Sequence, residues 1–85
     1  MAYSVVFAPS AERDFRKLPR RVQLRLSPHI DVLATNPRPA DATKLKAAAS
    51  VWRIRIGDFR ILYEVRDRAL VVMVMRVAHR REVCR

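Results

Sequence analysis

The chain has 85 residues, of which 51% are hydrophobic, and its 18 Lys and Arg against 8 Asp and Glu give a formal net charge of +10. This length and composition predict one small domain with a packed core, residues 1–85, and exclude a second domain and a disordered chain. The charge predicts a polyanionic partner, such as nucleic acid, a phosphate-rich particle or an acidic protein, and binding that weakens as salt is added.

The N-terminal segment predicts a strand followed by a helix. Residues Tyr3 to Phe7 are rich in β-forming side chains. Ser10 is a suitable N-cap for a helix over Ala11 to Leu18, and Pro19 ends that helix. The apolar stripe of this helix consists of Ala11, Phe15 and Leu18.

A second helical pattern begins at Arg20 or Arg21, so soon after the first that the two helices are expected to form a hairpin. Its apolar face consists of Val22, Leu26, Ile30 and Leu33. Pro28 removes a backbone donor from this helix, and it predicts a kink near Leu24 to Ser27 or a restart at Pro28. The run Asn36-Pro37-Arg38-Pro39 ends the helical region.

The second half of the chain predicts a loop and then a three-stranded meander. The polar, Ala-rich segment Ala40 to Ser50 is predicted to be a loop, and Val51 to Val65 a β-hairpin that turns at Gly57-Asp58. Asp67-Arg68 predicts a second turn, and the nearly continuous apolar run Leu70 to Val77 predicts an interior strand. The last eight residues predict a charged tail or a short helical turn.

The order of these elements indicates an α+β domain. An N-terminal strand, a helical hairpin and a three-stranded antiparallel meander follow one another, so both helices are expected to pack on one face of the sheet.

A two-residue turn of type II′ at Gly57-Asp58 fixes the register of the predicted hairpin. Its apolar face then consists of Trp52, Ile54, Ile56, Phe59, Ile61 and Tyr63. Arg53, Arg55 and Arg60 share the other face, and Arg55 lies directly opposite Arg60. Like charges in such a pair destabilise a sheet by up to ~1 kcal/mol. The pair is either part of a solvated outer face or an anion site, in which a bound phosphate relieves the repulsion.

Other classes of protein are excluded by the cysteine content and the hydrophobic pattern. Cys84 is the only cysteine, so an intramolecular disulfide or a Cys-based metal site cannot form, and we expect neither a metal nor a cofactor. The N-terminus lacks a basic segment followed by a long apolar run, and the apolar run Ala69 to Met75 is too short to span a bilayer. We therefore expect a cytoplasmic protein without membrane contact.

Several short motifs, each occurring once, follow one another along nearly the whole chain. They are Tyr3-x-Val5-x-Phe7, Ala11-x3-Phe15-x2-Leu18-Pro19, Leu33-x2-Asn36-Pro37, Lys44-Leu45, Trp52 to Tyr63, and Val77-x-His79-Arg80-Arg81-x-Val83. Together they resemble the RelE side of the RelE/ParE superfamily of bacterial toxins from type II toxin–antitoxin modules. The resemblance implies a RelE-like fold. It also implies a ribosome-dependent, metal-independent endoribonuclease that cleaves mRNA and inhibits translation.

The resemblance implies site residues as well. In the family, basic residues on the first hairpin strand and an arginine on the second line the active site. These positions fall on Arg53, Arg55 and Arg60, with Arg60 expected to stabilise the phosphate. A further basic residue near the C-terminus corresponds to Arg80 or Arg81. Many relatives carry a tyrosine near the chain end for proton transfer or stacking, whereas this chain has Cys84, which cannot stack like a phenol.

Proton transfer needs another kind of residue, because arginine is effectively always protonated. Candidates are His79, Glu64, Glu82 and Cys84. His79 has the most suitable unperturbed pKa, ~6.5, but a lone histidine after a strand is also typical of an ordinary surface residue. Glu64 is equally explained as a structural partner of Arg53 or Arg66.

The expected partners are mRNA, the ribosome and a cognate antitoxin. Lys44 and Lys46, together with Arg53 and Arg55, are predicted to contact RNA of the ribosome. The net charge of +10 suits an acidic, partly disordered antitoxin that folds on the toxin surface, in a complex of higher oligomeric order.

Two alternatives stay open. The first is a ParE-like poison of DNA gyrase, which shares the fold but lacks the nuclease residues; the arginine-rich hairpin and the short helix connection favour the nuclease. The second is a catalytically weakened toxin that mainly binds its antitoxin, an interpretation that Cys84 supports.

Overall fold

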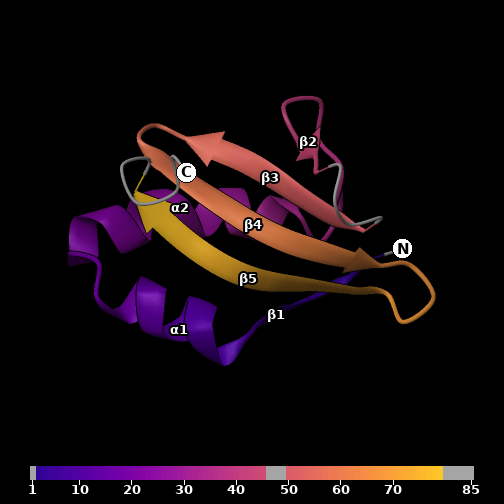
Figure 1. Ribbon diagram of the computed structural model, residues 1–85, viewed down its shortest axis with the longest axis horizontal. Helices are drawn as coiled ribbons and strands as arrows, with labels where there is room; N and C mark the ends of the chain where they lie inside the picture. Colours follow the sequence, from indigo (N-terminus) through magenta and orange to yellow (C-terminus); the bar gives the residue numbers. More distant parts are fainter. Residues whose placement is uncertain (1, 46–49, 80–85) are drawn as a thin grey trace.

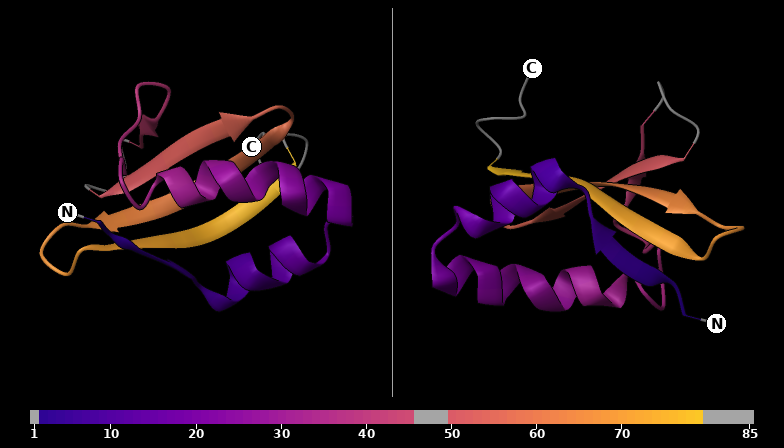
Figure 2. Two further views of the ribbon diagram at one scale, coloured as in Figure 1. Left: turned by 180° about the vertical axis from the view of Figure 1, so that it is seen from behind. Right: turned by 90° about the horizontal axis from the view of Figure 1, so that it is seen from below.

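The computed structural model describes residues 2–45 and 50–79, which form an α+β domain (Figure 1). Its elements are β1 (Ser4–Phe7), α1 (Pro9–Arg16), α2 (Arg20–Val32), β2 (Thr43–Lys44), β3 (Val51–Ile56), β4 (Phe59–Arg66) and β5 (Val71–His79). The strands form one sheet in the order β1-β5-β4-β3-β2. Figure 2 shows both helices on one side of this sheet, as the sequence predicts.

Helix α1 begins earlier than predicted, and Ser10 is not its N-cap. Pro9 occupies the first turn, where its fixed φ favours a helix start, and the N-cap residue Ala8 makes no side-chain hydrogen bond. Ser10 Oγ instead donates to the carbonyl oxygen of Met75 in β5 at 2.8 Å. The prediction was wrong because the helix begins at Pro9, so Ser10 lies inside the first turn and its hydroxyl bonds to the sheet.

Helix α2 continues through Pro28, so the predicted restart at this residue does not occur. The missing N–H of Pro28 removes only the helical hydrogen bond to the carbonyl of Leu24. Pro28 lies on the exposed side of the helix and Leu24 is 57% exposed, so water can replace that bond. The opposite side of α2 supplies the buried residues Leu26 and Ile30.

The β3–β4 hairpin has the predicted register, with Arg55 opposite Arg60 and Trp52 opposite Tyr63. Gly57 has a φ of 60° and Asp58 has no positive φ, as a type II′ turn requires. Strand β5 lies between β4 and β1, which confirms the predicted interior strand.

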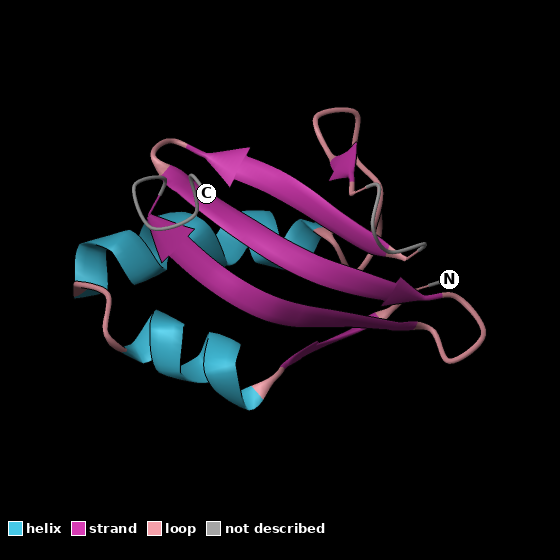
Figure 3. Cartoon of the chain, viewed as in Figure 1, coloured by secondary structure: helices cyan, strands magenta, loops and turns pink. Residues whose placement is uncertain are grey.

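Two features of the sheet were not predicted. Thr43 and Lys44 form the short strand β2 beside β3, within the segment predicted to be a loop (Figure 3). Strand β1 joins the other side of the sheet, parallel to β5. A two-residue bridge is too short to show a strand period, and a parallel pairing depends on a partner far along the chain.

The buried core lies between the sheet and α2. Its sheet residues are Ile54, Ile56, Ile61, Tyr63, Val65, Val72, Val74 and Val77, and its helical residues include Ala11, Leu26, Ile30 and Leu33. Side chains alternate along each strand. The residues that lie between these core residues on each strand therefore project to the face without helices. We call this second side the open face.

Helix α1 completes the edge of β5 beyond the end of β1. Strand β1 pairs with β5 only as far as Val74. Further along, Ser10 donates to the carbonyl of Met75, and Asp14 Oδ2 accepts a hydrogen bond from the N–H of Val77 at 3.0 Å. The register of β4 and β5 also shifts at this level, leaving Met75 as an extra residue. Side chains of α1 thus satisfy backbone groups that an edge strand would expose.

Hydrogen bonds also hold the opposite end of the sheet, near the β4–β5 turn. Asp67 accepts hydrogen bonds from Tyr3 and from Arg38, each at 2.7 Å, and these two bonds lower the pKa of Asp67. The buried hydroxyl of Tyr63 donates to the carbonyl of Pro37 at 2.7 Å. Burial raises the pKa of Tyr63 to about 12. The network ties the N-terminus and the segment after α2 to the sheet.

Candidate functional site

The open face carries three arginines close to the β3–β4 turn. Arg55 and Arg60 are directly opposite each other, and Arg53 lies two positions along β3, opposite Leu62. Arg55 is exposed, whereas Arg53 and Arg60 are half-buried. Over residues 2–45 and 50–79, none of the three forms an ion pair. Two guanidinium groups therefore share one small area without a carboxylate between them.

Arg60 is the most constrained of the three. Its Nε is buried and has no hydrogen-bond partner in the described part of the chain. An unsatisfied buried donor costs roughly 1–3 kcal/mol. Opposite Arg60 on its other side is Ala78, a small buried residue of β5. A planar guanidinium fork that lacks an acceptor matches the geometry of a phosphate group, which it binds through two parallel hydrogen bonds.

Two other arginines of the open face have carboxylate partners. Arg66 Nε donates to Glu64 Oε1 at 2.9 Å, which confirms the structural alternative for Glu64. Arg76 Nε donates to Asp14 Oδ2 at 2.8 Å. Burial alone raises the pKa of Asp14, but the hydrogen bonds from Arg76 and the Val77 N–H outweigh it and lower that pKa. These pairs distinguish Arg66 and Arg76 from Arg53, Arg55 and Arg60, which form no ion pair within the described residues.

Sequence reasoning missed the position of Arg76. Arg76 pairs with Leu62, and Leu62 is two residues from Arg60 on β4. Arg76 therefore lies on the open face, near Arg60 but not directly opposite it. A single basic residue that interrupts the apolar run of β5 was the available signal. Its tie to α1 depends on a residue 62 positions away in sequence.

His79 lies on the other face of the sheet from Arg60. It pairs with Phe59, and the two rings meet edge to face with centroids 5.4 Å apart. Phe59 in turn pairs with the core residue Ile56. The fold therefore does not bring His79 to the arginine pair.

The predicted RNA-contacting lysines are not brought to the arginines either. Lys44 pairs with Trp52, so it lies on the face of the core side chains, while Thr43 is the neighbour of Arg53. Lys46, Arg80, Arg81 and Cys84 fall outside the described residues.

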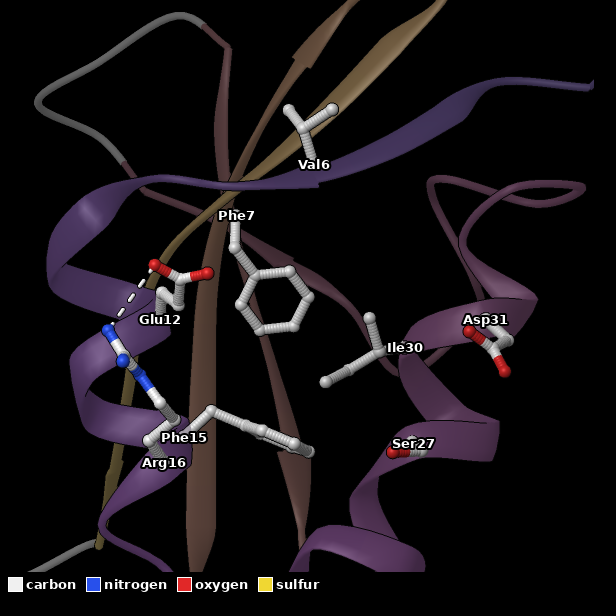
Figure 4. Close-up of a pocket in the computed structure, with 8 residues that line it drawn as sticks. All are labelled: Val6, Phe7, Glu12, Phe15, Arg16, Ser27, Ile30 and Asp31. Carbon is white, nitrogen blue, oxygen red and sulfur yellow. Dashed lines mark hydrogen bonds and ion pairs between the residues drawn. The ribbon is translucent and has the colours of Figure 1, made fainter.

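A separate groove lies between α1, α2 and β1 on the helical side of the sheet (Figure 4). It has a volume of about 640 Å³ and is lined by Val6, Phe7, Glu12, Phe15, Arg16, Ser27, Ile30 and Asp31. The sheet separates it from the arginine pair. Within the described ranges, no cluster of three or more His, Asp, Glu or Cys could hold a metal ion, and no helix could cross a membrane.

Comparison with known proteins identifies the family. Residues 5–84 match the sequence profile of the family described as the ParE toxin of the type II toxin–antitoxin system parDE. The chain is 30% identical to toxin RelG of Mycobacterium tuberculosis, over 100% of this chain and 99% of that protein. It is also 30% identical to the mRNA interferase toxin RelE of Escherichia coli K12, over 94% of this chain and 85% of that protein.

Comparison of the fold with solved structures identifies the same group of toxins. The crystal structure of the M. tuberculosis toxin–antitoxin complex RelBE2 contains a chain that superposes with a TM-score of 0.83 at 30% identity, covering 94% of this chain and 93% of that one. Sequence and fold agree on one superfamily, and the chain belongs to the ParE toxin family, as a RelE-like toxin of a type II toxin–antitoxin system.

Proposed function

We propose that this protein is a ribosome-dependent, metal-independent endoribonuclease that cleaves mRNA and thereby inhibits translation. The observation that carries this proposal is the facing pair Arg55 and Arg60, which no described carboxylate neutralises. The name of the E. coli relative, an mRNA interferase, supports the same activity.

The chemistry follows from what arginine can do. The 2′-hydroxyl of the mRNA gives up its proton and attacks the adjacent phosphorus. An O2′–P bond forms and the P–O5′ bond breaks to leave a cyclic phosphate, and the leaving O5′ takes up a proton to become a 5′-hydroxyl. Charge grows on the nonbridging oxygens, where Arg55 and Arg60 stabilise it more strongly in the transition state than in the substrate. Arg53 contacts the neighbouring phosphate.

The remaining site residues keep their predicted roles only in part. Arg80 or Arg81 supplies a further cation, and the proton that leaves the 2′-hydroxyl passes to a group outside the arginine pair. Cys84 and Glu82 are the candidates for that group. We do not assign proton transfer to His79, because it lies beside Phe59 on the far face. Lys44 and Lys46 contribute to binding through charge rather than through the reaction.

The partner in the resting state is an acidic antitoxin. The M. tuberculosis relative was solved in complex with its antitoxin, and a net charge of +10 suits an acidic polypeptide here. We propose that the antitoxin covers the arginine pair and that the complex is a higher oligomer. Release of the antitoxin then allows the toxin to act on mRNA in the ribosome, in the cytoplasm.

Induced expression of Arg60→Ala in bacteria tests the activity. We expect mRNA cleavage to fall about 10²–10³-fold, because a donor to the transition state is lost, and growth arrest to disappear. Arg66→Ala is the matched control, since Arg66 lies on the same strand and face but is paired with Glu64. Equal growth arrest by Arg60→Ala and wild type would overturn the assignment.

The second candidate is a DNA gyrase poison, which the ParE description of the family favours. Mapping of mRNA 5′ ends separates the two, because a gyrase poison produces a DNA-damage response without new mRNA ends. A toxin weakened at Cys84 would bind antitoxin tightly and leave translation unchanged.

A further inference from the structure

Arg76 reaches the open face because of an irregularity in β5. The register shifts between Leu62 and Tyr63, and Met75 is left as an extra residue. Beyond the shift, Arg76 pairs with Leu62. In an uninterrupted ladder Met75 would lie opposite Leu62, and Arg76 would project to the helical side. The extra residue is a β-bulge, a feature that is frequent beside functional sites because it re-aims the side chains that follow it.

Helix α1 holds this bulge from the side (Figure 1). Ser10 Oγ donates to the carbonyl of Met75 at 2.8 Å. Asp14 Oδ2 accepts one hydrogen bond from the N–H of Val77 at 3.0 Å and another from Nε of Arg76 at 2.8 Å. One carboxylate therefore holds both the backbone after the bulge and the side chain that the bulge turns toward the open face.

The ion pair of Asp14 and Arg76 has its cation on the outside. The side chain of Asp14 is 19% exposed, whereas that of Arg76 is 58% exposed. The hydrogen bonds to Asp14 come from Nε and Nη2 of Arg76, and a guanidinium has five N–H donors in total. Asp14 therefore orients Arg76 before a ligand binds, which reduces the side-chain entropy that binding would cost.

Arg76 and Arg53 flank Leu62 on the open face. Leu62 pairs with Arg53 on one side and with Arg76 on the other. Neighbouring strands lie about 4.8 Å apart, so the Cα atoms of the two arginines are about 10 Å apart and both side chains can reach a group above Leu62. Leu62 is half-buried and apolar, so it offers neither guanidinium an acceptor.

This row of residues lies one phosphate away from the facing arginine pair. Leu62 is two residues from Arg60 along β4, a rise of about 7 Å. That rise is similar to the distance between successive phosphates in an extended RNA strand. Glu64 has the next position on the same face, where it is paired with Arg66. The cations along β4 therefore match two successive phosphates, and an acidic side chain follows them.

We propose that Arg76, oriented by Asp14, binds the mRNA phosphate next to the scissile one, on the opposite side of that phosphate from Arg53. The proposal rests on the proposed function and adds a substrate-binding residue to the same site. The neighbouring phosphate carries the same charge in the substrate and in the transition state. The contact should therefore strengthen mRNA binding and leave the rate of the chemical step unchanged.

The test is a double-mutant cycle between the toxin and the mRNA. Full-length wild type and Arg76→Ala act on purified ribosomes programmed with mRNA that carries one uncharged methylphosphonate linkage, either 5′ or 3′ to the cleavage site. On unmodified mRNA, Arg76→Ala should raise the half-saturating concentration of programmed ribosomes about tenfold and keep the maximal rate of wild type. At one of the two linkages, the methylphosphonate should weaken wild type similarly and add little to the effect of Arg76→Ala.

Two further variants separate substrate binding from a structural role. Arg66→Ala removes another paired arginine of the open face and should behave as wild type on all three mRNAs. Arg76→Lys should recover part of the binding, because it keeps the charge but loses the planar fork. Thermal unfolding checks that each variant is folded. Independent effects of Arg76→Ala and the methylphosphonate at both linkages would overturn the proposal, as would a lower maximal rate with unchanged half-saturation.

The subsite and the proposed activity fail separately. Wild type that cuts no mRNA would refute the nuclease. The same cycle is then measured as binding to ribosomes whose mRNA has a 2′-deoxy nucleotide at the expected cleavage site, where no cleavage is needed. Coupling between Arg76 and one linkage in this binding cycle would support the subsite even so. Its absence would refute the subsite, whether or not wild type cleaves.

Discussion

Asp67 at the β4–β5 turn accepts hydrogen bonds from Tyr3 and Arg38, whereas Arg55 and Arg60 beside the β3–β4 turn face each other with no described carboxylate between them. Both regions are ends of the same sheet in the same basic chain. At the first, cations are matched to acids and tie distant segments together. At the second, Arg55 and Arg60 lie directly opposite each other although their like charges repel. The difference supports the proposal that the arginine pair binds an anion, and it predicts opposite consequences for mutations at the two ends.

The largest effect on stability is expected for Asp14→Ala. This change removes the acceptor of the Val77 N–H and the partner of Arg76, and it should lower the free energy of unfolding by about 2–3 kcal/mol. It removes the carboxylate that pairs with Arg76 at 2.8 Å, so it tests how much this ion pair contributes to the fold.

The pH dependence of this effect has a defined sign. The pKa of Asp14 is lowered below its ordinary 3.8 in the folded state, so its contribution is complete above that value and is lost as the pH falls through the folded pKa. Chemical denaturation at a series of acidic pH values should show a steeper loss for wild type than for Asp14→Ala. Parallel curves would contradict the role of the ion pair.

Tyr63→Phe tests the paired end. Loss of the hydroxyl leaves the carbonyl of buried Pro37 without its donor and should reduce stability by about 1.5 kcal/mol, with no change in mRNA cleavage. The folded pKa of about 12 lies above the ordinary 10.0, so the tyrosine stabilises the fold fully below pH 10 and loses that contribution toward pH 12. Denaturation of the phenylalanine variant should be less sensitive to pH over this interval.

The smallest effect on stability, and one of opposite sign, is expected for Arg55→Thr. Removal of the facing like charge should raise the free energy of unfolding by a few tenths to about 1 kcal/mol, because threonine also suits a strand. Cleavage of mRNA should fall at the same time. A variant that is less stable and less active would show that Arg55 has a structural role, which would remove the contrast between the two ends.

The hairpin shows how far local sequence reaches. Gly57-Asp58 and the alternation on each side of it fix the register, so the pairing of Arg55 with Arg60 was predictable from adjacent residues. Strand β2 was not, because two residues carry no period. The N-cap prediction for Ser10 also failed, since the competing acceptor lies 65 residues away.

The candidate site divides in the same way. The side of the sheet on which Arg53, Arg55 and Arg60 lie follows from the alternation of side chains along the two hairpin strands. The face of His79 follows instead from its pairing with Phe59 across β4 and β5, after a shift in register between Leu62 and Tyr63 that changes which residues of β5 share a side. No local pattern marks such a shift.

The sequence by itself therefore determined the α+β class, the hairpin register and the unusual pair of facing arginines, because each depends on the period of neighbouring residues and on one glycine turn. Only the tertiary structure decided which arginines have partners. Arg76 gains Asp14 from α1, Arg38 gains Asp67 from the β4–β5 turn, and Arg25 reaches Gly57 across the tip. These contacts join residues far apart in the chain, and the charge that remains unpaired depends on how the elements pack.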